Sequence, residues 1–547
     1  MNSRCLALAA VLAIACGADG GSTVNDGGSA GAAGSGLDVS GAAGQSSAGA
    51  SAGQSPAGGS AGMGTVGGAP ASGNAGAPSG SGGAPADGGG TAGRGGTASS
   101  GAGGLGGGAL GGAVGTGGAG PVTLPSGVTG LFPVPGATGS CADPALRLSF
   151  ANAPKLGASG KLRVFDAASA SAVVTVDFAV STVTKDIGGQ TFNVPRQIYV
   201  DGNDVVIPLS SKALPYGKQY YVTLEAGAIV PAGGAFSISD TKAWRFTTLA
   251  SAASGSSLSV ALDGSGQFCS WQGALDAVPA KNTAPVTISI KNGNYYGVVY
   301  FSGKQAITLH GQDRKKTVLS GVNNNTLNPS TVGRALVGAD GAKGLIVEDL
   351  TIRNLTPQGG SQAEALRLQN CDQCVVRRAD ILSLQDTLLW SGRLYAEDCY
   401  IAGNVDFVWG TGAVYFNRCE IKTVGRSGYI VQSRNDTGYG YVFVDSKISS
   451  DAGITGSTLA RIDVSVYPNS HVAYVNCTLG SHISKAGWTI TGGSKPSTLR
   501  FWEYQSKDES GGLIDVSGRV GGVQMTTQQV TQMRDPKVVL GGWQPPQ

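Results

Sequence analysis

The chain has 547 residues, enough for two or three domains, with a formal net charge of +3 and only 13% charged residues. It has no block of Lys and Arg, which argues against a nucleic-acid-binding protein and against electrostatic attachment to a membrane. The three histidines, His310, His471 and His482, are scattered and interpreted as structural, and no H-E-x-x-H motif occurs, so a histidine-metal site is not expected.

Residues 1–16, MNSRCLALAAVLAIAC, are typical of a bacterial export signal, because Arg4 precedes an apolar run too short to span a membrane. The ending LAIAC resembles a lipobox, in which Cys16 becomes the lipidated N-terminus. Ordinary secretion, with cleavage near the same place, is the alternative. The sequence thus predicts a protein that is secreted or anchored at the bacterial outer membrane, touching the membrane only through a lipid. Without Cys5 and Cys16, seven of the nine cysteines remain, so at least one is a free thiol.

Residues 17–120 are almost entirely Gly, Ala and Ser, with five charged residues among them. Such a composition cannot bury enough apolar surface to offset the entropy of ordering it. We therefore expect a disordered linker, with a root-mean-square span of roughly 50–60 Å. Such a tether suits a domain held near an extended polymer outside the cell.

Residues 121–249 change to short runs rich in β-branched and aromatic residues, such as KLRVFD, AVVTVDF and YYVTLE, separated by turn-rich pieces. This pattern predicts an antiparallel β-sandwich. The stretch from YGKQYYVTLE to WRFTT resembles bacterial Ig-like domains that are often joined to exported enzymes. We see no catalytic constellation in it and favour a spacer over a glycan-binding module.

Residues 250–547 repeat a short strand that ends in an aliphatic residue, at uneven intervals of 20 to 31 residues. The repeated positions are Ile352, Ile381, Ile401, Ile421, Ile448 and Leu479. No long helices are expected between the strands, so each unit must stack on its neighbours to bury its apolar face. This pattern favours a parallel β-helix. The segment SWQGALDAVP, residues 270–279, predicts a short amphipathic helix that caps the first coil.

Two aspartates, Asp386 in QDTLLW and Asp406 in DFVWG, are separated by one 20-residue coil. Residues one coil apart lie above one another at roughly 4.8 Å, so these side chains are expected to stack. Cys399 and Cys419 have the same spacing and are expected either to form a disulfide or to line the core. The single CxxC at 371–374 has no second pair and is not interpreted as a metal site.

Ionisation of both members of a stacked carboxyl pair is unfavourable, because two like charges would lie close together. One of the two is therefore expected to have a raised pKa. That arrangement supplies a nucleophile and a proton donor; a pair of solvated turn aspartates is the alternative. Trp390, Phe407 and Trp409 flank the acids. Their aromatic faces suit stacking on a sugar ring, with core packing as the alternative reading.

The motifs QAEALRL, QDTLLW, DFVWG and LARID resemble, in order and rough spacing, those of the pectinesterase family. NGNYYGVV, GYIVQSR and FWEY add to this resemblance, which covers the whole last segment. It implies an all-β chain whose catalytic domain is a right-handed parallel β-helix that removes methyl esters from polygalacturonate, without metal or cofactor. The implied partner is methyl-esterified pectin, and we expect a monomer that binds no nucleic acid.

Position by position, the resemblance implies that Asp406 is the nucleophile and that Asp386 acts first as general acid and then as base. Gln385 and Gln362 would donate hydrogen bonds to the oxyanion. Arg461 in LARID would pair with Asp406. The residue at 463 departs from the family, because Asp463 stands where a substrate-contacting tryptophan is usual.

Other readings stay open at this point. A β-helical lyase or polygalacturonase would shorten the polymer rather than release methanol. An esterase for another acylated polysaccharide is left open by Asp463. A noncatalytic pectin-binding lipoprotein would retain the fold without ester hydrolysis.

Overall fold

The computed structural model describes residues 124–546. The expected export signal, the lipidation position Cys16 and the expected linker at 17–120 lie outside the described residues. Among the helices that the structure describes, none has the length and apolarity needed to cross a membrane.

The first part of the described chain is the expected Ig-like β-sandwich. Within residues 124–546 its strands form a four-stranded sheet, ordered β1-β3-β10-β9, a five-stranded sheet, ordered β2-β13-β11-β5-β6, and the two-stranded pairs β4-β12 and β7-β8. Alternating side chains of β5 are buried, as expected for a strand with one face on a core. The bounds are β1 Val128–Phe132, β2 Ala137–Ser140, β3 Ala145–Phe150, β4 Lys155–Leu156, β5 Lys161–Asp166, β6 Ala172–Asp177, β7 Thr182–Ile187, β8 Gln190–Pro195, β9 Tyr199–Asp201, β10 Asp204–Pro208, β11 Gln219–Leu224, β12 Ile229–Val230 and β13 Arg245–Thr248.

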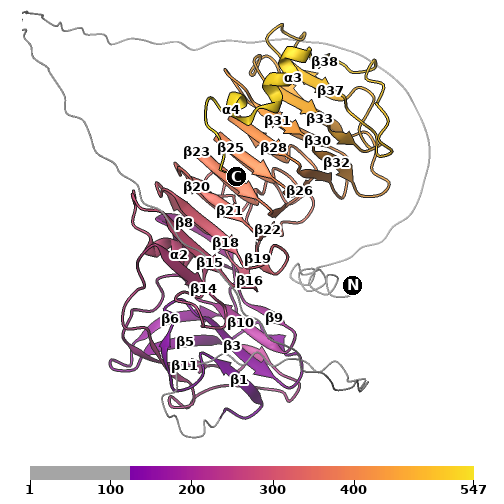
Figure 1. Cartoon of the computed structure of the whole chain (residues 1–547). Helices are drawn as coiled ribbons and strands as arrows, with labels where there is room; N and C mark the ends of the chain where they lie inside the picture. Colours follow the sequence, from indigo (N-terminus) through magenta and orange to yellow (C-terminus); the bar gives the residue numbers. More distant parts are fainter. Residues whose placement is uncertain (1–123, 547) are drawn as a thin grey trace, which may run out of the picture. The chain divides into compact units, whose positions relative to one another are not determined.

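The second part is the expected parallel β-helix, whose strands follow one another from β14 to β38 (Figure 1). The strands of the longer sheet are β14 Ser257–Val260, β15 Val286–Ile290, β17 Val299–Ser302, β18 Ile307–Gly311, β20 Val337–Asp340, β21 Ile346–Glu348, β23 Leu366–Arg377, β25 Leu388–Glu397, β27 Val408–Gly410, β28 Gly412–Asn417, β30 Tyr429–Ser433, β31 Tyr441–Val444, β33 Thr458–Asp463, β34 His471–Val475, β36 Trp488–Thr491, β37 Arg500–Tyr504 and β38 Val523–Gln524. Those of the second sheet are β16 Gly293–Tyr296, β19 Thr317–Gly321, β22 Thr351–Asn354, β24 Asp380–Leu382, β26 Tyr400–Gly403, β29 Glu420–Thr423, β32 Lys447–Ser450 and β35 Thr478–Leu479.

The repeated aliphatic positions form one continuous rung-by-rung stack in the second sheet. Ile381 pairs with Ile401, and Ile401 pairs with Ile421. The stack extends to Ile352 on one side and through Ile448 to Leu479 on the other. All are at most 2% exposed. The prediction that these residues share one phase is confirmed, and the uneven intervals are taken up outside the strands.

Three short helices lie at the β-helix. The expected helix at the first coil is α2, Trp271–Ala277, whose N-cap Ser270 accepts a hydrogen bond from the Gly273 backbone nitrogen at 3.0 Å. Helices α3, Thr527–Arg534, and α4, Pro536–Val539, contact β28, β31 and β34 of the longer sheet.

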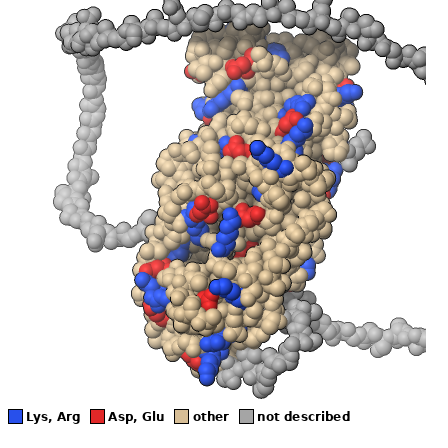
Figure 2. Space-filling view, turned by 90° about the vertical axis from the view of Figure 1, so that its left-hand side faces the viewer, with Lys and Arg blue, Asp and Glu red and all other residues tan. Residues whose placement is uncertain are grey.

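Surface charges are mixed in sign. Figure 2 shows Lys and Arg side chains interspersed with Asp and Glu on one face, among a majority of other residues. Ion pairs join many charged residues of the described chain, such as Arg393 with Asp372 at 2.6 Å and Arg418 with Asp398 at 3.0 Å. This distribution agrees with the absence of a basic block in the sequence.

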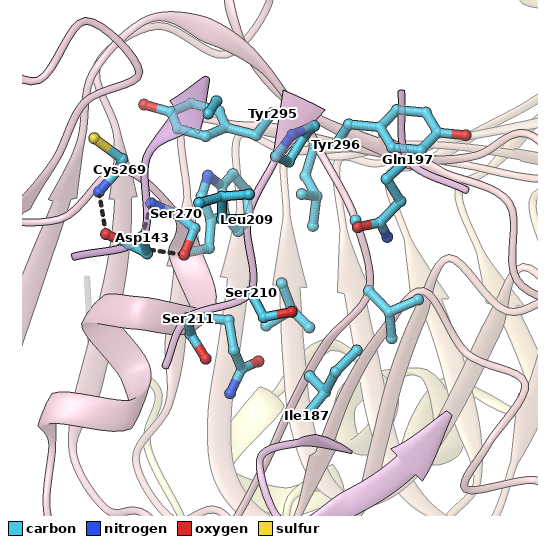
Figure 3. Close-up of a pocket in the computed structure, with 18 of the residues that line it drawn as sticks. Asp143, Ile187, Gln197, Leu209, Ser210, Ser211, Cys269, Ser270, Tyr295 and Tyr296 are labelled. Carbon is cyan, nitrogen blue, oxygen red and sulfur yellow. Dashed lines mark hydrogen bonds between the residues drawn. The ribbon is translucent and has the colours of Figure 1, made fainter. Parts of the chain in front are cut away.

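A junction joins the Ig-like domain to the first coil. Its disulfide, Cys141–Cys269, was not expected from the sequence. Next to it, the buried Asp143 carboxylate accepts hydrogen bonds from the Cys269 and Ser270 backbone nitrogens at 3.0 and 2.9 Å and from the Ser270 hydroxyl (Figure 3). In contrast, Cys399 and Cys419 are free thiols buried in the core, so the disulfide alternative for that pair is wrong.

Candidate active site

Three acidic residues, Glu364, Asp386 and Asp406, occupy the same position on consecutive coils; we call them the acidic column. Each stands two residues before a strand of the longer sheet, and these strands pair Leu366 with Leu388 and Leu388 with Val408. The register therefore stacks the three acids. The expectation that one coil separates the two aspartates agrees with this pairing.

The backbone fixes both aspartates in a left-handed conformation, with φ of +63° at Asp386 and +47° at Asp406. Aspartate tolerates this region better than most residues. The Asp386 backbone nitrogen donates to the Val405 carbonyl at 3.0 Å, and that of Asp406 donates to the Tyr429 carbonyl at 2.8 Å. These backbone hydrogen bonds between neighbouring coils thus keep Asp386 and Asp406 in register.

Asp406 is 6% exposed and is held by a forked ion pair with Arg461 on β33. Arg461 Nε donates to Asp406 Oδ1 at 2.7 Å, and Nη2 contacts Oδ2. The guanidinium also lies over the Tyr429 ring, 4.5 Å from its centroid. A two-point pair of this kind fixes the carboxylate plane and compensates its charge. The pair raises the pKa of Arg461, so the cation persists at all relevant pH.

Asp386 has a different environment, although it is only one coil away. The residue is 7% exposed, and burial raises its pKa to about 8, with further contributions from the negative charges of Glu364 and Asp406. Arg334 opposes this shift by donating from Nη2 to Asp386 Oδ2 at 2.9 Å. At neutral pH Asp386 is therefore mostly protonated and able to act as an acid.

Glu364 and Arg334 were missed by the sequence reasoning. Glu364 is fully buried, and Arg334 Nε donates to both of its oxygens at 2.9 Å. A glutamate within the apolar run QAEALRL was the available signal. Arg334 had none, because it lies in an irregular segment before β20 at no repeat-related spacing.

Gln362 and Gln385 border the acidic column and are half-buried. The Gln385 carbonyl accepts from the Ala363 nitrogen at 3.1 Å, which places the two glutamines on adjacent coils. Gln362 Oε1 accepts from the Ser361 hydroxyl at 2.9 Å. Within residues 124–546, neither side-chain amide nitrogen donates to a protein acceptor, so both remain available to a substrate oxygen.

The aromatic residues divide into two groups. Trp390 and Phe407 are 0% exposed, and Trp390 stacks on Phe416 at 5.6 Å between ring centroids. These two side chains belong to the core, which corrects the expectation that they contact substrate. Trp409 is nearly buried, and the Arg434 guanidinium lies over its ring, 4.4 Å from the centroid. Trp409 is on β27, the strand that follows Asp406.

Asp463 lies on β33, two residues after Arg461 and thus on the same face of that strand. Its Oδ1 accepts from the Ser465 backbone nitrogen at 3.0 Å and from the Ser465 hydroxyl. The residue is half-buried. It therefore places a carboxylate in a small turn beside the cation that holds Asp406.

Metal-type ligands gather elsewhere in the described part of the chain. His310, Glu348 and Asp349 lie together, but Glu348 pairs with Arg377 and Asp349 with Arg378, both at 2.6 Å. The acidic column is itself compensated by arginines. A protonated carboxyl beside an ionised, aligned carboxylate, with two free amide donors, can perform nucleophilic acyl transfer.

Two family models match the chain: "Pectinesterase" over residues 257–535 and "Bacterial Ig-like domain" over residues 122–248. Among curated proteins, "Probable pectinesterase 56" of Arabidopsis thaliana is 35% identical over 244 residues, covering 42% of this chain and 84% of the relative. "Pectinesterase 31" of the same plant is 31% identical over 261 residues, covering 45% and 81%. Among solved structures, pectin methylesterase from carrot is 27% identical and covers 52% of this chain and 93% of its own, with a TM-score of 0.48.

Proposed function

The chain belongs to the pectinesterase family, and on that premise we propose that its acidic column hydrolyses methyl esters through an acyl-enzyme on Asp406. It is a carboxylic ester hydrolase that removes methyl esters from pectin. The observation that supports the assignment of roles is the contrast within one stacked pair. Asp406 is compensated by Arg461, whereas burial keeps Asp386 protonated near neutral pH.

In the first half-reaction, an Asp406 oxygen bonds to the C6 carbonyl carbon of a methylated galacturonate, and the carbonyl electrons move to oxygen. The amides of Gln362 and Gln385 donate to this oxyanion, each contributing about 3 kcal/mol. Collapse of the oxyanion breaks the bond to the methoxy oxygen. Asp386 gives its proton to that oxygen, so methanol leaves and Asp386 becomes ionised.

In the second half-reaction, water attacks the acyl carbon and Asp386 takes the proton from the water. The bond between the carbonyl carbon and Asp406 then breaks. The products are a galacturonate carboxyl and an Asp406 carboxylate, and Asp386 is again protonated. Arg461 is expected to keep Asp406 aligned through both steps.

We propose polygalacturonate as the polymer and the Ig-like domain as a spacer. Asp463 supports a preference for heavily methylated stretches, because its carboxylate repels free uronates nearby. The second candidate, an esterase for another acylated polysaccharide, is left open by the same residue, because Asp463 replaces a tryptophan that is usual in the family. Export with lipid attachment at Cys16, followed by the linker at 17–120, remains our proposal for how the domain reaches its substrate.

A methanol-release assay on methylated pectin tests these roles. Asp406→Asn is expected to lower kcat by at least about 10⁴-fold, and Asp386→Asn by about 10²- to 10⁴-fold. Both variants should keep the wild-type unfolding temperature within a few degrees. The rate should be bell-shaped in pH, with the alkaline limb near 8 reporting Asp386. Near wild-type methanol release by Asp406→Asn would contradict the assignment.

A second readout separates the rival reactions. Polymer length, measured by size-exclusion chromatography, should stay constant while methanol accumulates. Acetylated xylan gives the matched comparison for the second candidate function. Faster release of acetate from that polymer than of methanol from pectin would favour the alternative substrate.

A further inference from the structure

Glu364 has no role in the mechanism above, yet it is the first member of the acidic column. Its side chain is fully buried, one coil from Asp386. Burial of a carboxylate is unfavourable without a cation and hydrogen bonds. The burial of Glu364 beside another acid therefore requires an explanation that links it to its neighbours.

Arg334 provides the cation and divides its donors between the two acids. Its Nε donates to both Glu364 oxygens at 2.9 Å, and its Nη2 donates to Glu364 Oε1 at 2.7 Å. The same Nη2 donates to Asp386 Oδ2 at 2.9 Å. Arg334 is itself nearly buried, so water does not screen these contacts.

We propose, building on the roles assigned above, that Arg334 and Glu364 are a positioning pair for Asp386. Arg334 fixes the orientation of the Asp386 carboxyl by a direct hydrogen bond. Glu364 offsets the positive charge of Arg334, which by itself would favour the ionised form of Asp386. An arginine alone at this place would orient Asp386 but also ionise it. The glutamate lets the orienting donor stay without this effect.

The charges around Asp386 agree with this reading. Among the described residues, the groups that face it are Glu364, Arg334, Asp406, Arg434 and Arg461. Burial is the main reason that its pKa is high, and Glu364 is the largest charge contribution in the same direction. Arg334 and Arg434 act in the opposite direction. Removal of the Glu364 charge alone must therefore lower the pKa of Asp386.

The pair also suits the second half-reaction, in which Asp386 carries a negative charge until water gives up its proton. The Arg334 hydrogen bond to Oδ2 is already in place when that charge appears. Charge-assisted donors of this kind stabilise a transient anion without reorganisation. The hydrogen bond thus acts on both protonation states, whereas Glu364 sets the balance between them.

The test compares pH profiles of kcat/KM for methanol release by the full chain. Glu364→Gln is expected to move the alkaline limb down by at least about one pH unit. Glu364→Asp, which keeps the charge, should leave the limb within about half a unit of the wild type. Arg334→Lys, which keeps the cation but loses the fork, should lower kcat several-fold with little change in KM or in the limb.

A double variant gives the sharper outcome. Arg334→Gln/Glu364→Gln removes both charges, so its alkaline limb should return to within about half a pH unit of the wild type. This variant buries no unpaired charge, so it serves even where Glu364→Gln does not fold. A limb that falls by a full unit in the double variant, or that does not move in a folded Glu364→Gln, would overturn the proposal.

The failure of this inference can be told from a failure of the proposed function. If the wild type releases no methanol, or if Asp386→Asn is as active as the wild type, the proposed roles themselves are wrong. If both of those results are as expected and only the limb of Glu364→Gln stays in place, Glu364 is structural and the rest of the mechanism stands.

Discussion

Asp143 at the junction and Asp386 in the acidic column are both buried aspartates with pKa values raised by burial, but their partners differ. Asp143 accepts from two backbone nitrogens and a hydroxyl, all on the segment that begins α2. Asp386 accepts from one nitrogen of Arg334 and faces two other acids. The contrast indicates that a buried carboxyl surrounded by fixed donors stabilises the fold, whereas one with few donors remains free to exchange a proton.

The largest difference between the two regions should appear when a donor is removed from each. Gln385→Ala or Gln362→Ala is expected to lower kcat by about 10²- to 10³-fold, because an oxyanion donor is lost. Ser270→Ala removes the hydroxyl that donates to Asp143 and caps α2, and should cost about 1–3 kcal/mol of stability without changing kcat. Methanol release and urea unfolding measure both effects. A lower kcat in fully folded Ser270→Ala would contradict the prediction that the donors to Asp143 act on stability alone.

Loss of the disulfide Cys141–Cys269 should affect stability alone. It closes a loop of 128 residues, so replacement of both cysteines by serine is expected to lower the free energy of unfolding by about 2–5 kcal/mol. The kcat of the folded variant should match that of the wild type. Cys399→Ser, at a buried free thiol, is the matched control for the loss of a cysteine.

The pH dependence of stability gives a smaller effect that is specific to the acidic column. With a folded-state pKa near 8, Asp386 keeps a proton that the unfolded chain releases above about pH 4. Stability therefore falls between pH 4 and 8 by up to about 1.4 kcal/mol per pH unit. Asp386→Asn should flatten this slope in urea unfolding, and the exposed Asp436→Asn should not. An unchanged slope would mean that Asp386 is ionised in the folded protein.

The smallest expected effect concerns Asp463. Asp463→Trp removes a carboxylate from the strand face that carries Arg461 and should improve kcat/KM on weakly methylated pectin by a few-fold, equivalent to about 1 kcal/mol or less. Asp463→Asn tests the charge without adding an aromatic ring. Identical kinetics across pectins of different methylation would reject a role for this residue in selectivity.

The stacking of the coils could be predicted because one aliphatic phase, from Ile381 through Ile401 to Ile421, survives every change in loop length. The same spacing placed Asp386 above Asp406. The spacing of residues along the sequence does not predict the direction in which a large side chain points. Trp390 and Phe407 looked suited to a sugar because they flank the acids, but both point into the core, where Trp390 stacks on Phe416.

Contacts between irregular segments could not be predicted either. Arg334 reaches the acidic column from a loop before β20, and Cys141 meets Cys269 across a domain boundary. The spacing between Arg334 and Asp386 and that between Cys141 and Cys269 do not follow the repeat, so no periodic signal in the sequence connects the two members of either pair. Cys399 and Cys419 had such a signal, but they are buried free thiols in the short turns that precede β26 and β29.

The aliphatic stack from Ile352 to Leu479 has a consequence for how such an enzyme diversifies. Since the interval between rungs varies while the rungs stay aligned, residues can be inserted or deleted between two strands without displacing the residues above and below. Evolution can therefore remodel the loops between the strands independently of the acidic column. A loop grafted from a related enzyme beside β33 offers protein engineers the same freedom.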